Sequence, residues 1–388
     1  MPHTVCGVPL TQTKAASTFR KTAETFAAGA KTLAQQYFAS PEVFAEEQDR
    51  IFSTQWVLVG HQSQLAEAGD YFVAEVASES LIIVRDKGGE LQGFYNVCRH
   101  RGTRLREDRN GHLSAIQCPY HAWTYGLDGR LIGAPHMDQV PGFDKTNYSL
   151  HAANLALWEG FIFVSLEDAS TQRGGYISLE EWFAPLTGKF SHWNLPKLRA
   201  AKRIEYDVKA NWKLMFENYS ECYHCPGVHP MLSKVSPYDS AENDLTKGPF
   251  LGGFMKINKG AGLTMSGKAC ALPVGKIENL QEVFYYSIFP NMLLSLHPEY
   301  VMVHQLWPQS PERTLILCDW LFHPEAFERE DFNPNDAIQF WDMINRQDWH
   351  VCELSQQGIS SRAYEPGPYS ARESIPAAWD EYYLRQIS

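Results

Sequence analysis

The chain has 388 residues, 44% of them hydrophobic, and a formal net charge of −11 at pH 7. This length allows for about two domains, and the acidic balance argues against a nucleic-acid partner, which a basic surface would attract. No apolar run is long enough to cross a membrane, and the first residues lack the apolar stretch of a signal peptide. We therefore expect a cytoplasmic protein, in which paired cysteines more often bind metal than form disulfides.

The first part of the chain changes from a helical to a strand pattern. Residues 19–53 are predicted to be helical, with Ser40 as an N-cap and Pro41 at the first helical position. Short apolar runs such as WVLVG, YFVAEVA and SLIIVRD follow from about residue 55. Their length and their Gly- and Asp-containing turns predict a β-rich region that continues to about residue 164.

The second part combines helices and strands. A polar stretch over 167–175 is a predicted linker. A helix is expected near 211–224, several strands follow, and a long helix covers about 335–357. The overall prediction is an α+β protein with three parts: N-terminal helices that pack on the last domain (1–53), a small all-β domain (54–166) and a larger domain with an antiparallel sheet (176–388).

Two Cys-His pairs in the β-rich region have the spacing of a metal centre. Cys98 and His100 form C-x-H, and Cys118 and His121 form C-x-x-H seventeen residues later. Two cysteines and two histidines can hold zinc or a Rieske [2Fe–2S] cluster, in which cysteines bind one iron and histidines the other. Each pair lies on a β loop with Cys before His, which favours the cluster.

A second group of ligands lies in the stretch SECYHCPGVHP, residues 220–230. Proline disfavours helix at the residue before it, and glycine permits a sharp turn. We therefore expect the preceding helix to end near His224, and the Pro226-Gly227 turn to bring His229 back beside it. That geometry suits two ligands on one metal ion.

The long helix offers a third ligand. Asp348 is the best candidate because Asn345 and Cys352, at i−3 and i+4, can share its inward face. Two histidines and a carboxylate form the facial triad of non-haem Fe(II) oxygenases, which leaves positions open for dioxygen. Glu221, three residues before His224, is either a further ligand or an acid that orients that histidine. The C-x-x-C of Cys222 and Cys225 is interpreted as packing rather than as a zinc or redox site.

The two groups together resemble a known family. The CPYHAWTY stretch and the later NWK, ENY, ECYH and HP elements resemble Rieske non-haem iron oxygenase α subunits. This resemblance implies a helix-grip catalytic domain and head-to-tail homotrimers. It also implies a bridge from Glu221 to His121 of a neighbouring subunit, with Asn218 and Tyr219 beside the pocket. The sequence outside the ligand motifs resembles the branch of the family that oxidises quaternary ammonium compounds such as glycine betaine, carnitine and choline.

The resemblance implies a terminal oxygenase that uses O2 and NADH-derived electrons. The chain has no dinucleotide fingerprint and no ferredoxin cysteine run, so a separate flavin and iron–sulfur reductase must supply the electrons. Hydroxylation of an N-methyl group gives a carbinolamine that loses formaldehyde, a net demethylation. Aromatic faces suit a quaternary ammonium group. The candidate aromatic residues of the pocket, which would otherwise be core residues, are Phe216, Tyr219, Tyr223, Tyr285 and Phe289.

Two other functions remain open from sequence. An oxygenase of the same type could hydroxylate an aromatic or other small carboxylic acid instead. A non-catalytic electron carrier or a zinc-stabilised binding protein would use the Cys-His pairs but would have no need for Asp348.

Overall fold

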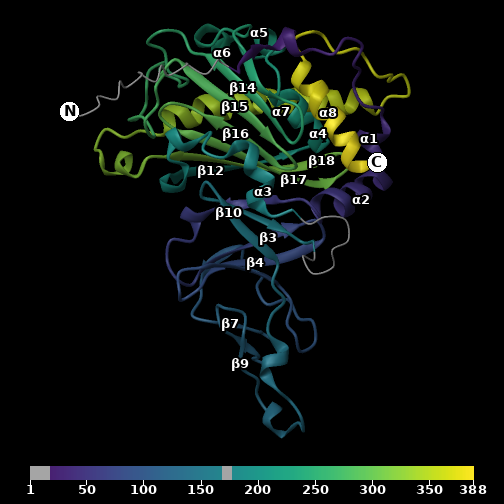
Figure 1. Ribbon diagram of the computed structural model, residues 1–388, viewed down its shortest axis with the longest axis vertical. Helices are drawn as coiled ribbons and strands as arrows, with labels where there is room; N and C mark the ends of the chain where they lie inside the picture. The colour runs from purple at the N-terminus through teal and green to yellow at the C-terminus, as the bar shows by residue number, and fades with distance from the viewer. Residues whose placement is uncertain (1–17, 168–176) are drawn as a thin grey trace, which may run out of the picture.

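The structure is a computed structural model that describes residues 18–167 and 177–388. Figure 1 shows a broad upper part, built on one large sheet, and a narrow lower part made of small sheets. The predicted linker 167–175 lies, apart from its first residue, outside the described residues. No helix in the described ranges is long and apolar enough to cross a membrane.

The lower part contains three small antiparallel sheets. Their orders are β10-β11-β2, β5-β4-β3-β6 and β7-β8-β9. Ile82, Val84 and Phe94 belong to a core cluster within this part, whereas buried side chains such as Val57 and Ile162 join a cluster with the upper part. The strands are β2 Val57–His61, β3 Asp70–Val76, β4 Glu79–Arg85, β5 Leu91–Tyr95, β6 Asn110–His112, β7 Ile116–Gln117, β8 Thr124–Tyr125, β9 Leu131–Gly133, β10 Asn154–Trp158 and β11 Phe161–Ser165.

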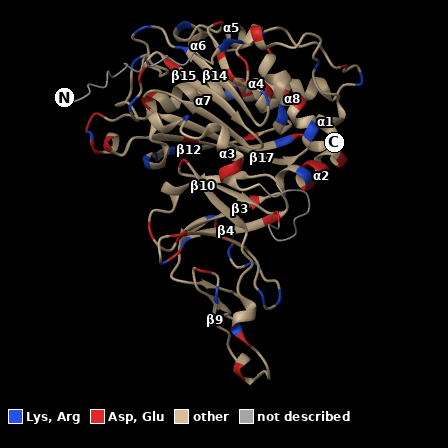
Figure 2. Ribbon diagram, in the orientation of Figure 1, with Lys and Arg blue, Asp and Glu red and all other residues tan. Residues whose placement is uncertain are grey.

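The upper part is an eight-stranded antiparallel sheet with the order β1-β13-β14-β15-β16-β17-β18-β12. Figure 2 shows that the strands of this sheet are mostly uncharged, as burial between layers requires. The strands are β1 Arg20–Lys21, β12 Arg199–Val208, β13 Glu242–Thr246, β14 Phe250–Lys256, β15 Glu282–Ile288, β16 Met292–Leu296, β17 Val301–Ser310 and β18 Arg313–Phe322.

A long helix crosses one face of this sheet. Helix α7, Asn335–Ile359, has the predicted position and buries a stripe that includes Trp341, Ile344 and Asn345. It packs against α4 and β12, and the antiparallel sheet with its long helix confirms the predicted fold. The other α-helices are α1 Gln36–Ala39, α2 Pro41–Glu47, α3 Leu179–Phe183, α4 Trp212–Tyr219, α5 Cys225–Val228, α6 Pro230–Val235 and α8 Ser374–Ile387.

The N-terminal region differs from its helical prediction. Residues 20–21 form β1, which pairs with β13 at one edge of the large sheet. Only a 3-10 turn over Thr22–Thr25 follows before α1, because pairing with the sheet edge overrides the helical preference of the segment. The second half of the prediction is confirmed: the Ser40 hydroxyl accepts bonds from the Glu42 and Val43 N–H groups, with Pro41 in the first turn.

Candidate active site

Two similar loops carry the Cys-His pairs of the lower part. In each loop the cysteine carbonyl accepts a bond from the N–H four residues later, at Gly102 and Ala122. Both of these residues have a positive φ, 75° and 55° respectively. Glycine adopts this conformation without strain, and its occurrence at Ala122 indicates that the surrounding loop enforces it. The loops thus present the two pairs in the same way.

The four side chains differ in exposure: the thiols are buried, His100 is exposed and His121 is half-buried. Cys98 and Cys118 are buried free thiols, and burial raises the pKa of the Cys98 thiol. The imidazole of His100 stacks on Trp123 with 4.7 Å between ring centroids and lies 4.9 Å from the His121 ring. Two buried thiols and two neighbouring histidine rings are the donor set of a Rieske cluster.

The segment before the second group of ligands does not continue the helix. Helix α4 ends at Tyr219, five residues earlier than predicted. The Glu221 carboxylate accepts bonds from the backbone N–H groups of Tyr223 and His224. These bonds hold the segment between the two helices in an irregular turn, a common use of acidic side chains at helix starts.

The Pro226-Gly227 dipeptide also has a different role from the predicted one. It does not interrupt the chain but lies inside the one-turn helix α5, where proline near the start of a helix is tolerated. His224 and His229 flank this turn, and the His229 N–H donates to the Cys225 carbonyl at 2.8 Å. The two histidines are brought together by a short helix rather than by a helix break.

His224, His229 and Asp348 meet at one point. One donor atom from each lies within 4.8 Å of the other two. The Asp348 Oδ1 atom is 2.7 Å from His229 Nε2 and 3.2 Å from His224 Nε2. His229 is 2% exposed. Two nitrogens and one carboxylate oxygen, converging from two elements, match the donor set of a non-haem iron site.

Two further side chains orient the histidines. The Nδ1 atom of His224 is 2.6 Å from Glu221 Oε1, and that of His229 is 2.8 Å from Gln347 Oε1. Each Nδ1 must therefore carry a proton, which leaves the Nε2 lone pairs for a metal. Without a metal, burial lowers the pKa of His224, but bonds to Asp348 and Glu221 outweigh it and raise the pKa to about 10. A metal ion that binds Nε2 would therefore displace the proton there.

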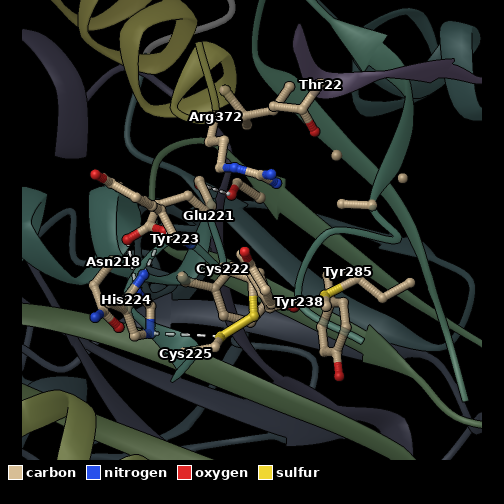
Figure 3. A pocket seen from close by; sticks show the side chains of 18 of the residues that line it. Thr22, Asn218, Glu221, Cys222, Tyr223, His224, Cys225, Tyr238, Tyr285 and Arg372 are labelled. Carbon is tan, nitrogen blue, oxygen red and sulfur yellow. Dashed lines mark hydrogen bonds and ion pairs between the residues drawn. A yellow bond between two sulfur atoms is a disulfide. The ribbon is translucent and has the colours of Figure 1, made fainter. Parts of the chain in front are cut away.

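A cavity of about 520 Å³ lies over these three residues. The predicted pocket residues Asn218, Tyr219, Tyr223 and Tyr285 line it. Glu221, which was predicted to orient His224 or to bind the metal, lines it as well, and Figure 3 shows Asn218 and Glu221 beside His224.

Two of the residues that were predicted to line the pocket do not line it. Phe216 and Phe289 are fully buried and are not among the residues that line the cavity. Phe216 stacks on Trp379 at 5.0 Å, and Phe289 packs on Trp379 and Tyr382. Both side chains point to the helical core of the upper part, a direction that the residue types alone do not reveal.

The deep end of the cavity is mainly aromatic. The rings of Tyr219 and Tyr285 meet edge to face at 5.9 Å, and Tyr285 meets Trp341 at 6.3 Å. Trp349 lies 5.9 Å from the ring of His304. The Tyr219 hydroxyl is 2.9 Å from the Ser295 hydroxyl, so its polar end is satisfied while its ring remains available to a ligand.

His304 was missed by the sequence reasoning. It lines the cavity and is 1% exposed, and burial lowers its pKa to about 4. The Tyr206 hydroxyl donates to Asp342 and accepts from Asn345 Nδ2, so Asn345 Oδ1 faces His304 Nε2. His304 is therefore a neutral ring with its proton on Nε2.

Arg372 and Gln347 were also missed. Arg372 lies in the loop before α8 and Gln347 directly precedes Asp348. No spacing rule connects an arginine near residue 372 with ligands near residue 224. Gln347 could have been found from its place beside the predicted carboxylate.

The two cysteines of the ECYHC stretch form a disulfide. Cys222 and Cys225 are joined, and both line the cavity beside His224 (Figure 3). The expectation that paired cysteines bind metal rather than form a disulfide, and the interpretation of this pair as packing residues, are therefore wrong at this position. No zinc site that includes these cysteines is found among residues 18–167 and 177–388.

A β domain with paired Cys-His loops, joined to a sheet-and-helix domain with a two-histidine, one-carboxylate site, defines a Rieske-type non-haem iron oxygenase. Comparisons agree with this class. The model for the Rieske [2Fe-2S] domain matches residues 55–144, and the model for the ring hydroxylating alpha subunit (catalytic domain) matches residues 195–388.

Individual relatives show the same relationship. The glycine betaine monooxygenase oxygenase subunit of Chromohalobacter salexigens is 31% identical, over 88% of this chain and 82% of its own length. The carnitine monooxygenase oxygenase subunit of Acinetobacter baumannii is 29% identical, over 86% of each chain. A solved quaternary ammonium Rieske monooxygenase, described with carnitine oxidation and inter-subunit electron transfer, has a TM-score of 0.79 and 27% identity, over 92% of this chain and 95% of its own.

The chain belongs to the family of Rieske oxygenase α subunits. Its two domains imply a Rieske [2Fe–2S] cluster and a mononuclear iron, and the residues present fit both groups. Cys98, His100, Cys118 and His121 would hold the cluster, and His224, His229 and Asp348 would hold the iron.

Proposed function

We propose that the protein is the terminal oxygenase of a system that demethylates a quaternary ammonium compound with O2 and NADH-derived electrons. The observation that supports this best is the aromatic deep end of the cavity that His224, His229 and Asp348 also line. A trimethylammonium group has no hydrogen to donate, and aromatic faces attract it by about 0.5–2 kcal/mol per contact.

Iron and cluster, when bound, supply dioxygen activation and single electrons respectively. The chain's own residues position the reaction. Glu221 and Gln347 fix the two histidine rings, and the neutral ring of His304 adds no positive charge that would repel a cationic substrate. The aromatic walls exclude water from the N-methyl group, which reduces loss of the oxidising equivalents to side reactions.

The expected overall reaction balances with two electrons and two protons. One oxygen atom enters a C–H bond of the N-methyl group and the other leaves as water. The carbinolamine that results breaks its C–N bond and releases formaldehyde together with the demethylated amine.

The arrangement of the chain supports electron transfer between subunits. In Figure 1 the strands β7 and β9, next to the Cys-His loops, lie at the opposite end of the molecule from α5, which is flanked by His224 and His229. A head-to-tail homotrimer would place His121 of one subunit near Glu221 of the next. A separate flavin and iron–sulfur reductase would deliver electrons to the cluster.

The test is a product assay with the purified protein, a reductase and NADH. Glycine betaine, carnitine and choline are compared with aromatic carboxylic acids, and formaldehyde is measured. Asp348→Ala should abolish formaldehyde release because the iron loses one of three ligands, while the visible absorbance of the cluster remains.

His350→Ala, an exposed position on the same helix, is the matched control and should keep full activity. Hydroxylated aromatic acids without formaldehyde from any ammonium compound would refute the proposed substrate class, and full activity of Asp348→Ala would refute the assigned iron ligand.

A further inference from the structure

The cavity changes in character between its deep end and its mouth. At the deep end, Trp341 and Trp349 are 5% and 6% exposed. At the mouth, the exposed side chains of Lys21 and Arg372 line the same cavity. A ligand that fills the cavity would therefore meet aromatic rings at one end and positive charge at the other.

Arg372 is available for a ligand. Its guanidinium lies 5.1 Å from the centroid of the Tyr238 ring, and none of the ion pairs found within residues 18–167 and 177–388 includes it. Figure 3 shows the side chain projecting into the cavity. A guanidinium presents a planar fork of donors that matches the two oxygens of a carboxylate.

The loop that carries Arg372 is fixed against the N-terminal segment. The Tyr369 N–H donates to the Ala30 carbonyl at 3.0 Å, and the Gly367 N–H donates to the Thr32 hydroxyl at 3.0 Å. Stacking on Tyr238 further limits the orientation of the guanidinium. Part of the ordering cost of ligand binding is therefore already met in the free protein, which favours affinity.

We propose that Arg372 binds the carboxylate of a zwitterionic substrate whose quaternary ammonium head occupies the aromatic deep end. This inference rests on the proposed function and narrows it from quaternary ammonium compounds in general to quaternary ammonium carboxylates. Asp239 also lines the cavity, but the two positive charges of Lys21 and Arg372 outnumber its single negative charge at the mouth. An uncharged alcohol at that end would leave the guanidinium without an anionic partner.

The test measures equilibrium binding to the holoenzyme by calorimetry in the absence of O2. The probes are glycine betaine and carnitine, which carry a carboxylate, and choline, which does not. Hydrogen bonds to charged groups contribute about 1.5–3 kcal/mol, so Arg372→Gln should raise the Kd of both carboxylates about 10- to 100-fold. The Kd of choline should stay within about twofold, since that ligand makes no ionic contact with Arg372.

A second readout separates binding from general damage. Arg372→Lys should recover part of the affinity for the carboxylates, and turnover of Arg372→Gln should show a raised KM with an unchanged kcat. Arg362→Gln, an exposed arginine of the same loop that does not line the cavity, is the matched control and should bind all three probes like the wild type.

The outcomes distinguish the two levels of the proposal. A wild-type enzyme that demethylates glycine betaine, with the same affinity in Arg372→Gln, would overturn the carboxylate subsite alone. Equal loss of affinity for choline and the carboxylates would also overturn it. A wild-type protein that binds none of the three probes would overturn the proposed function together with the subsite.

Discussion

The two histidines of the candidate iron site differ in the group that holds their outer nitrogen. His224 Nδ1 faces the carboxylate of Glu221, whereas His229 Nδ1 faces the neutral amide of Gln347. Both partners fix the ring, but only the carboxylate adds negative charge behind it, which makes His224 the more basic ligand. The Glu221 contact is consistent with the orienting role that the sequence left open, and its bridge to another subunit remains a prediction.

Loss of the Gln347 amide should weaken iron binding. In Gln347→Leu the His229 ring loses its fixed orientation, and removal of such a partner typically lowers metal affinity about 10- to 100-fold. Iron content after dialysis against a graded chelator measures this. Gln357→Leu, on the exposed side of the same helix, should retain iron like the wild type, and equal retention by both variants would contradict the role of Gln347.

Helices α2, α4 and α8 meet in a buried polar network next to the site. The Lys213 ammonium is 2.5 Å from Glu47 Oε1, and these side chains are 0% and 1% exposed. The Trp212 indole and the Tyr383 hydroxyl also donate to the Glu47 carboxylate. A buried pair with this many hydrogen bonds is costly to break, so the network fixes α4, whose C-terminal end leads directly into the Glu221–His229 segment.

The same region should make stability depend on pH. Burial raises the pKa of Asp380 to about 7, against opposing hydrogen bonds from Tyr369 and Glu217. Lys213 also faces it, and burial raises the pKa of Glu217 as well. The folded pKa of Asp380 exceeds the unfolded value, about 3.9, so the folded protein holds this proton more tightly. The resulting contribution to the free energy of unfolding is complete below about pH 4 and is lost as pH rises to about 7.

Thermal unfolding between about pH 4 and about pH 7 tests this dependence, because the proton occupancy of Asp380 differs between the folded and unfolded states only in that range. The wild-type Tm should fall across this range, and Asp380→Asn should show a smaller fall because the amide cannot ionise. Glu381→Gln, 65% exposed on the same helix, should keep the wild-type slope. A slope in Asp380→Asn equal to that of the wild type would contradict the assignment.

Local signals predicted some elements well and others poorly. Helix α7 was predicted because apolar residues recur on one face along its length. The Ser40 cap was predicted because a serine followed by proline is a local signal for the start of a helix. The strand at residues 20–21 was not predicted, since its partner is β13, more than two hundred residues away. For the same reason the burial of Phe216 and Phe289 could not be predicted: it depends on Trp379, which only the folded chain brings beside them.

At the scale of the whole molecule, the sequence predicted the candidate iron ligands and part of the cavity lining, but not the rest of the lining. The two histidines share a short motif, Asp348 lies on an inward helix face, and the structure places His224, His229 and Asp348 together. Arg372, Tyr238 and His304, which also line the cavity, come from three separate segments. No short pattern links such residues, so only the three-dimensional structure identifies them.

Electron transfer between subunits predicts complementation between two inactive variants. His121→Ala lacks a cluster ligand and Asp348→Ala lacks an iron ligand, so each homo-oligomer should be inactive. A mixed oligomer places the intact cluster of one variant beside the intact iron site of the other. Formaldehyde release should therefore reappear after co-expression of the two variants.

Native mass spectrometry of the co-expressed sample must show that both variants share one oligomer. The control is co-expression of Asp348→Ala with His229→Ala, which both damage the iron site and should stay inactive together. Confirmed mixed oligomers with no recovered activity would contradict transfer between subunits.

The mouth and the base of the cavity come from different parts of the sequence. Lys21 and Thr22 belong to the first described strand and turn, and Arg372 to the loop before the last helix, whereas the three iron-facing residues lie between them. The entrance of the cavity and the candidate iron site are thus carried by separate segments of the chain. A chimaera that exchanges the two outer segments with those of a relative would replace the entrance while keeping the aromatic deep end and the candidate iron ligands.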